Sequence, residues 1–128
     1  MLGGFVTYTN QMKQALLGVS AQTLEQHTAV SEQVAAEMAR GARERTGADI
    51  AVSTTGLAGP GDDGIHDVGT VFVGVSTKEG EQVLSLSLSS QRSREFIRAV
   101  AATHALNLIR KAIEQRPDQA DDKCLSKL

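Results

Sequence analysis

Tyr8 and Lys13 are the two side chains in this sequence whose types and spacing best suit acid–base chemistry. Tyr8 ends a short β-branched and aromatic run, and Lys13 lies one turn into the helix expected to follow, so both can face one pocket. A lysine amine held near apolar surface can lose its proton near neutral pH, and a tyrosine hydroxyl can relay a proton or stabilise an oxyanion. Amide hydrolysis needs both a base and a group that relays a proton or stabilises the oxyanion. The alternative is an ordinary surface pair with the lysine stem lying on apolar surface.

A glycine-rich loop over residues 55–64 forms a second candidate site. It follows an apolar stretch directly, and its glycines let backbone N–H groups approach an anion or a carbonyl because no Cβ is in the way. Thr54 or Thr55 can add a hydroxyl to the same ligand. The loop lacks the Gly-Lys-Ser/Thr of a P-loop and the dinucleotide-binding fingerprint. The alternative is a plain glycine turn.

Four possible metal ligands lie in and just after the same loop: Asp62, Asp63, His66 and Asp67. Neighbouring aspartates in a loop are more typical of a solvated turn, in which carboxylates cap backbone N–H groups, than of a metal site. We therefore expect no metal ion and no other cofactor.

Hydrophobic periodicity and turn residues predict the elements that position these groups. Asn10, Ser20 and Ser31 are the expected helix N-caps, and Gly18 and Gly47 are the expected helix ends. The predicted order is strand 5–8, helix 10–17, helix 20–27, helix 31–46, strand 50–54, strand 70–75, strand 83–89 and helix 96–114.

These elements predict a layered α/β domain with a mixed sheet of about four strands flanked by helices. The two strands on either side of the turn at residues 78–81 should form a hairpin. The domain is expected to cover residues 1–114. Residues 115–128 are expected to be a polar tail, broken by Pro117.

Both candidate sites resemble the CinA C-terminal domain family, the nicotinamide-nucleotide amidases. The first family motif is Tyr, Ser or Thr, Asn, and Lys three residues further on, and residues 8–13 match it as Tyr-Thr-Asn-Gln-Met-Lys. The second is Thr/Ser-Gly-Ile-Ala-Gly-Pro, followed by Val-Gly-Thr-Val. Residues 55–60 match its first part with Leu57 for Ile, and residues 68–71 match its second part. The resemblance runs from about residue 4 to residue 113.

The resemblance implies hydrolysis of nicotinamide mononucleotide to nicotinate mononucleotide and ammonia, with Tyr8 and Lys13 as catalytic residues. It also implies self-association into a homo-oligomer. Arg94 and Arg98 lie where the family has arginines at the start of the last helix, and such an arginine can pair with a phosphate or lie on a solvated face. The implied substrate-binding residues are Asn10, Thr55, Gly56, Ala58, Gly59, Gly61 and Arg94.

One family segment has no counterpart in this sequence. Family members begin with a further strand and helix joined by Glu-Ser-Cys-Thr-Gly-Gly, whose serine is the proposed nucleophile, and no Ser-Cys pair occurs here. Three functions therefore stay open. They are an amidase with Lys13 as the base, a nucleotide-binding pseudoenzyme, and an interaction subunit that forms oligomers.

Composition excludes several other classes of protein. The 128 residues suit one domain, the formal net charge is −2, and no cluster of Lys and Arg suggests a nucleic-acid partner. Cys124 is the single cysteine, so no internal disulfide is possible and a reducing compartment is expected. No apolar run is long enough for a membrane span, and we expect no membrane partner.

The last three residues, Ser126, Lys127 and Leu128, match the tripeptide that a peroxisomal import receptor binds. A polar tail would present them to that receptor. We therefore expect a peroxisomal location with the receptor as a partner. The alternative is a cytoplasmic protein in which the tripeptide has no meaning.

Overall fold

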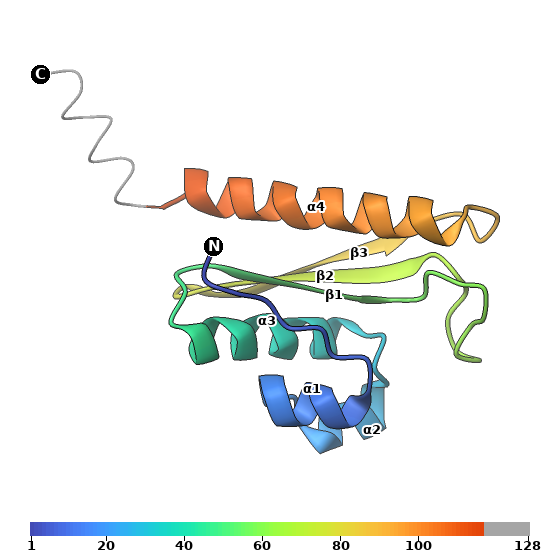
Figure 1. Cartoon of the computed structure of the whole chain (residues 1–128), viewed down its shortest axis with the longest axis horizontal. Coiled ribbons are helices and arrows are strands. Elements are labelled where there is room, and N and C mark those ends of the chain that lie inside the picture. Colours follow the sequence, from blue (N-terminus) through green and yellow to red (C-terminus); the bar gives the residue numbers. More distant parts are fainter. Residues whose placement is uncertain (117–128) are drawn as a thin grey trace, which may run out of the picture.

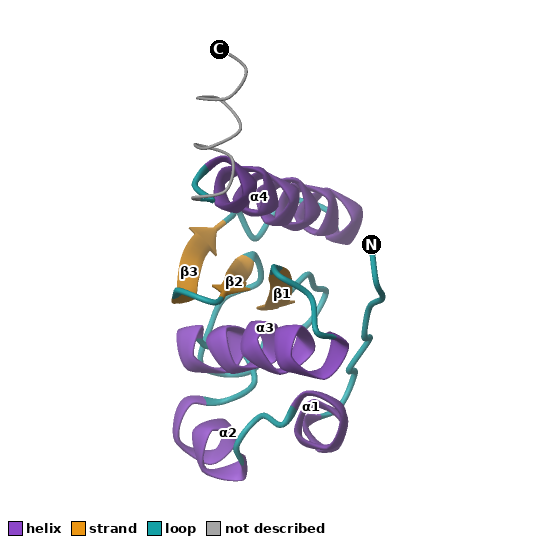
Figure 2. Cartoon of the chain, turned by 90° about the vertical axis from the view of Figure 1, so that its left-hand side faces the viewer, coloured by secondary structure: helices purple, strands orange, loops and turns teal. Residues whose placement is uncertain are grey.

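The computed structural model describes residues 1–116, which form a sheet with helices on both faces (Figures 1 and 2). The last helix covers one face, the third helix covers the other, and the first two helices pack on the outer side of the third. The elements are α1 (Asn10–Leu17), α2 (Ala21–His27), α3 (Glu32–Thr46), β1 (Ala51–Gly56), β2 (Thr70–Thr77), β3 (Gly80–Ser87) and α4 (Arg94–Glu114).

The sheet has the strand order β1-β2-β3, and both pairs are antiparallel. The α/β class and the predicted hairpin, which is β2 and β3, are confirmed. The sheet of residues 1–116 has three strands in antiparallel order instead of about four in a mixed sheet. β2 is central and its residues 71–76 are all buried, so β1 and β3 are the two edges.

The strand predicted at residues 5–8 is the missing fourth strand, and that prediction is wrong. These residues run beside the β1 edge of the molecule but join no ladder within residues 1–116 (Figure 2). Val6 is 76% exposed and Tyr8 is 88% exposed. β-branched and aromatic side chains favour a strand only when a neighbouring strand takes up the backbone hydrogen bonds.

Most predicted helix ends are confirmed. Ser20 and Ser31 cap α2 and α3, and Gly18 and Gly47 end α1 and α3 in the left-handed conformation. The prediction of Asn10 as the first cap is wrong by one residue, because Thr9 Oγ1 accepts the N–H of Met12. Thr9 has the extended backbone that a cap requires, whereas Asn10 is already helical.

The core lies on both faces of β2. On the α4 face, Val71 and Val73 pack against Ile97, Ala101 and Ala105. On the α3 face, Phe72 packs with Val30 and Ala35. Within residues 1–116, no helix is long and apolar enough to cross a membrane. The residues of the expected peroxisomal signal, Ser126, Lys127 and Leu128, lie outside the described residues.

Candidate active-site groove

A groove of about 1080 Å³ runs along the outer edge of β1. Residues 1–8 form one side, and β1 with α4 as far as Ile109 forms the other, while α1 and α3 add Lys13 and Met38. We call it the β1 groove. In Figure 2 the N-terminal segment passes beside the edge of the sheet, from the level of α4 down to α1. This volume is ample for a ligand the size of a nucleotide.

Lys13 is a buried cation in the wall of the β1 groove. Its relative exposure is 8%, and its Nζ donates a hydrogen bond of 2.8 Å to the carbonyl oxygen of Thr7. No carboxylate within residues 1–116 forms an ion pair with it. Burial lowers the pKa of the Lys13 ammonium below its ordinary value of 10.5, because loss of water disfavours the charged form. The amine is therefore shifted toward the neutral form that can accept a proton.

Tyr8 borders the same groove, so the structure brings the two predicted catalytic residues to one site. The phenol is 88% exposed and lies at the surface, where no hydrogen bond joins it to Lys13. Asn10, at the start of α1, is exposed and is not part of the groove wall. The arrangement leaves the Tyr8 hydroxyl available to a ligand.

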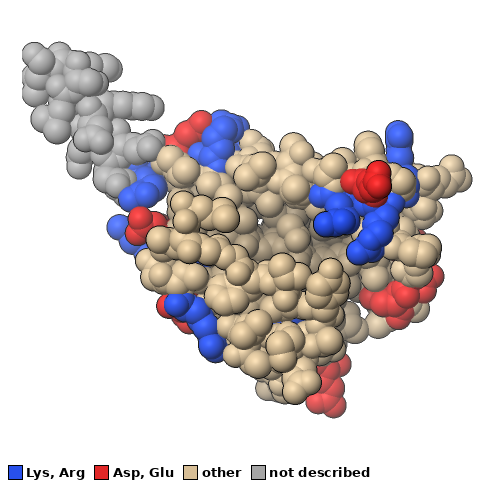
Figure 3. All heavy atoms as spheres, in the orientation of Figure 1, with Lys and Arg blue, Asp and Glu red and all other residues tan. Residues whose placement is uncertain are grey.

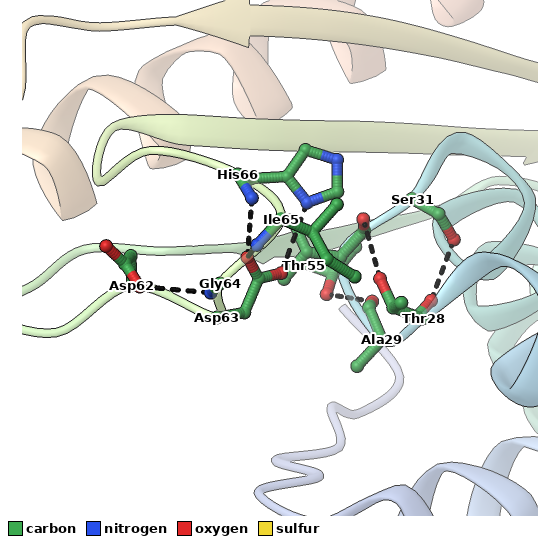
Figure 4. A network of polar contacts seen from close by, with 10 residues as sticks. Thr28, Ala29, Ser31, Thr55, Asp62, Asp63, Gly64, Ile65 and His66 are labelled. Atoms are coloured by element: carbon green, nitrogen blue, oxygen red, sulfur yellow. Dashed lines mark hydrogen bonds and ion pairs between the residues drawn. The ribbon is translucent and has the colours of Figure 1, made fainter.

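The hydroxyl group of Thr55 forms a hydrogen bond on the α3 face of the sheet. Its Oγ1 donates to the carbonyl oxygen of Ala29 at 2.6 Å, next to a turn in which Ser31 bonds Thr28 (Figure 4). Ser53 makes the same kind of bond to Ala35 at 2.6 Å. Alternation along β1 therefore directs Thr54 to the α4 face, where it is exposed in the β1 groove. Thr54 is the threonine better placed for a ligand.

The glycine loop has several different roles. A Cβ on Gly56 would lie 2.8 Å from the carbonyl oxygen of Thr70, so glycine is needed where β1 leaves β2. Gly59 has a positive φ of 86°. A Cβ on Gly61 would have no neighbouring atom within 4 Å, so that position is open. Gly56 and Ala58 line the β1 groove, whereas Gly59 and Gly61 lie beyond it.

Two arginines of α4 line the groove opposite residues 1–8. The Nη1 of Arg94 donates to the carbonyl oxygen of Gly59 at 2.9 Å and so joins α4 to the glycine loop. Arg98, one turn further along, lines the groove without a hydrogen bond or ion pair to residues 1–116. Figure 3 shows Lys and Arg side chains gathered over the end of the molecule where α4 begins, with an acidic group beside them.

The acidic part of the loop is a capped turn, as the sequence predicts. Asp63 Oδ1 accepts the N–H groups of Ile65 and His66 at 2.9 and 2.6 Å, and its Oδ2 lies 3.1 Å from His66 Nδ1 (Figure 4). These bonds, chiefly that of the His66 N–H, lower the pKa of Asp63 to about 2. Among residues 1–116, no group of three metal-ligating side chains meets around one point.

Together the fold and the groove define a layered α/β domain with a buried lysine and a glycine loop beside one sheet edge. The chain belongs to the CinA C-terminal domain family, whose sequence profile matches residues 1–113. Over 111 residues it is 44% identical to a competence-damage inducible protein of Streptococcus pneumoniae, a match covering 87% of this chain. The chain spans about a quarter (26%) of that relative's length.

Solved structures of the same superfamily have the same fold. The competence/damage inducible protein CihA from Agrobacterium tumefaciens superposes with a TM-score of 0.81 at 38% identity, over 88% of this chain and 68% of that one. A CinA superfamily protein from Escherichia coli superposes with a TM-score of 0.77 at 40% identity, over 83% of this chain and 61% of that one.

Proposed function

We propose that the β1 groove hydrolyses the carboxamide of nicotinamide mononucleotide to give nicotinate mononucleotide and ammonia. The observation that carries this proposal is Lys13, a groove amine with a lowered pKa and no carboxylate partner within residues 1–116. Membership of the CinA C-terminal domain family supports it, through the resemblance of residues 8–13 and 55–60 to the amidase motifs.

In the proposed reaction, the neutral Lys13 amine takes a proton from a water molecule held in the groove. The resulting oxygen nucleophile attacks the carboxamide carbon, and the Tyr8 hydroxyl donates to the oxyanion that forms. The Lys13 ammonium then returns the proton to the amide nitrogen, which leaves as ammonia.

Ammonia release from nicotinamide mononucleotide tests this proposal directly. We expect Lys13→Ala to lower kcat by at least about 100-fold, since a positioned base contributes about 10²- to 10⁴-fold. Lys78→Ala is the matched control, because Lys78 is an exposed lysine in the β2–β3 turn, away from the β1 groove. Equal rates for Lys13→Ala and the wild type, with both folded by circular dichroism, would contradict the proposal.

A second candidate function is nucleotide binding without turnover. It is favoured by the hydrogen bonding of Lys13, whose amine donates to the Thr7 carbonyl and to no hydroxyl group within residues 1–116. A ligand that binds only the folded state must raise the thermal midpoint. A clear thermal shift with nicotinamide mononucleotide, without ammonia release above the Lys13→Ala level, would select this function over the amidase.

A further inference from the structure

We infer that the β1 groove is a docking site for an extended, carboxylate-bearing segment of another polypeptide, which adds a strand to the outer edge of β1. The inference goes beyond the proposed function and does not depend on it. It rests on the backbone groups, the apolar walls and the charges that face the groove.

The outer edge of β1 leaves backbone groups without partners in the described part of the chain. The N–H of Leu57 donates to the Thr70 carbonyl oxygen at 2.9 Å, and alternate residues of an antiparallel strand bond the same neighbour. Residues 51, 53 and 55 therefore bond β2, and the backbone groups of Val52 and Thr54 face the groove. No backbone hydrogen bond joins this edge to another segment of residues 1–116. An unpaired strand edge of this kind is a template for a further strand.

The far wall of the groove is also extended chain. Residues 5–8 run beside β1, join no ladder within residues 1–116, and leave the groove open between themselves and the strand (Figure 2). The six residues of β1 offer an edge about 20 Å long, at about 3.3 Å per residue. An extended segment of similar length can therefore lie along β1.

Apolar side chains line the groove above and below the sheet edge. Ala105 and Leu106 of α4 lie on one side, and Leu17 of α1 and Met38 of α3 lie on the other. Leu106 is 67% exposed in the absence of a partner. Successive side chains of a strand point to opposite faces, so a strand added to β1 would meet apolar surface on both faces. The groove therefore favours a segment with apolar residues at consecutive positions.

Charge restricts that segment further. Lys13, Arg94 and Arg98 line the groove, and none of its described lining residues is Asp or Glu. A surface lined by one sign of charge favours a partner of the other sign. Residues 1–8 of a second copy have strand composition but no carboxylate side chain. The observations therefore favour a segment of a different polypeptide, apolar and with at least one Glu or Asp.

Fluorescence anisotropy of the full chain with a labelled, end-capped peptide Thr-Val-Ile-Val-Glu-Val-Ile-Thr tests the inference. We expect Thr54→Pro to weaken binding by at least about tenfold, because proline removes an N–H that faces the groove and leaves the bonds to β2 in place. Ser85→Pro is the matched control and should bind as the wild type does. Alternation from the N–H of Leu88, which bonds the Gly69 carbonyl at 2.9 Å, puts the N–H of Ser85 on the outer edge of β3.

Two altered peptides test the same contacts in the wild-type protein, so the measurement does not depend on whether Thr54→Pro folds. N-methylation of the peptide bonds removes the backbone donors, and glutamine in place of glutamate removes the charge. Each change should weaken binding by at least about tenfold. No binding of the original peptide by the wild type, or equal binding of either altered peptide, would overturn the inference. So would a dimer of the chain alone, seen by light scattering, that Thr54→Pro dissociates, because a second copy would then fill the edge.

Discussion

At the residue scale, Asp63 offers the clearest pH-dependent contribution to stability. Its carboxylate is held by backbone N–H groups of the loop and by His66, so its pKa falls to about 2 in the folded chain. A carboxylate with a lowered folded pKa stabilises the protein above its unfolded pKa, and that contribution is lost as the pH falls toward the folded value. The loop conformation should therefore weaken in acid.

Substitution of Asp63 by Asn keeps an oxygen acceptor and removes the charge. We expect the wild type to be more stable than Asp63→Asn at pH 6, with a difference that shrinks as the pH falls from about 4 toward 2. Urea denaturation across this range measures the difference. Asp67→Asn is the control, since the Asp67 side chain makes no hydrogen bond within residues 1–116. A difference independent of pH would show that the Asp63 charge is unimportant.

The sequence also predicted part of the site at this scale. Spacing and family motif put Tyr8 and Lys13 together, and both line the β1 groove, while their catalytic roles stay predictions. They did not reveal that the Thr55 hydroxyl is bonded to the Ala29 carbonyl although Thr55 is among the residues that line the groove, because that acceptor lies 26 residues earlier and has no local signal. The sequence left open whether Arg98 pairs with a phosphate or lies on a solvated helix face. Only the folded structure shows that Arg94, and not Arg98, donates a hydrogen bond to the glycine loop.

At the element scale, close packing of α1 on α3 determines where Lys13 lies. Gly41 in α3 is buried, and a Cβ there would overlap the backbone carbonyl of Leu17 at the end of α1. We expect Gly41→Ala to lower the free energy of unfolding by about 1–3 kcal/mol, because the two helices must separate. Gly61→Ala, at a position open on all sides, should stay within about 0.5 kcal/mol.

Urea denaturation of both glycine variants measures this effect. An unchanged midpoint for Gly41→Ala would show that α1 is not held against α3 as described, and would weaken the placement of Lys13. The shift of α1 should also lower activity in Gly41→Ala, because the base is carried on that helix.

The same scale shows why most elements were predictable and one was not. Helix ends depend on hydrogen bonds and backbone conformations within a few residues, so a short stretch of sequence is enough to predict them. This is the case for the caps Ser20 and Ser31 and for the helix ends at Gly18 and Gly47. A strand needs a partner elsewhere in the chain. Residues 5–8 have strand composition without such a partner in the described part, which composition cannot reveal.

At the scale of the whole molecule, we propose that the chain self-associates. β1 and β3 are both edge strands of the sheet formed by residues 1–116. Apolar side chains lie exposed beside the β1 edge, including Leu2 at 71% and Leu106 at 67%. Exposed strand edges and apolar surface favour association between copies. Light scattering coupled to size exclusion should give a multiple of the chain mass, and a monomer at every concentration would contradict the proposal.

The pH dependence of nicotinamide mononucleotide hydrolysis tests the central claim, that Lys13 is the base of the β1 groove, most directly. Because only the neutral amine can accept a proton, kcat/KM should rise with pH through an ionisation below 10.5, and that rise should be absent from the residual activity of Lys13→Met. The Lys78→Met control should keep the wild-type profile. An identical profile and rate in Lys13→Met would contradict the account.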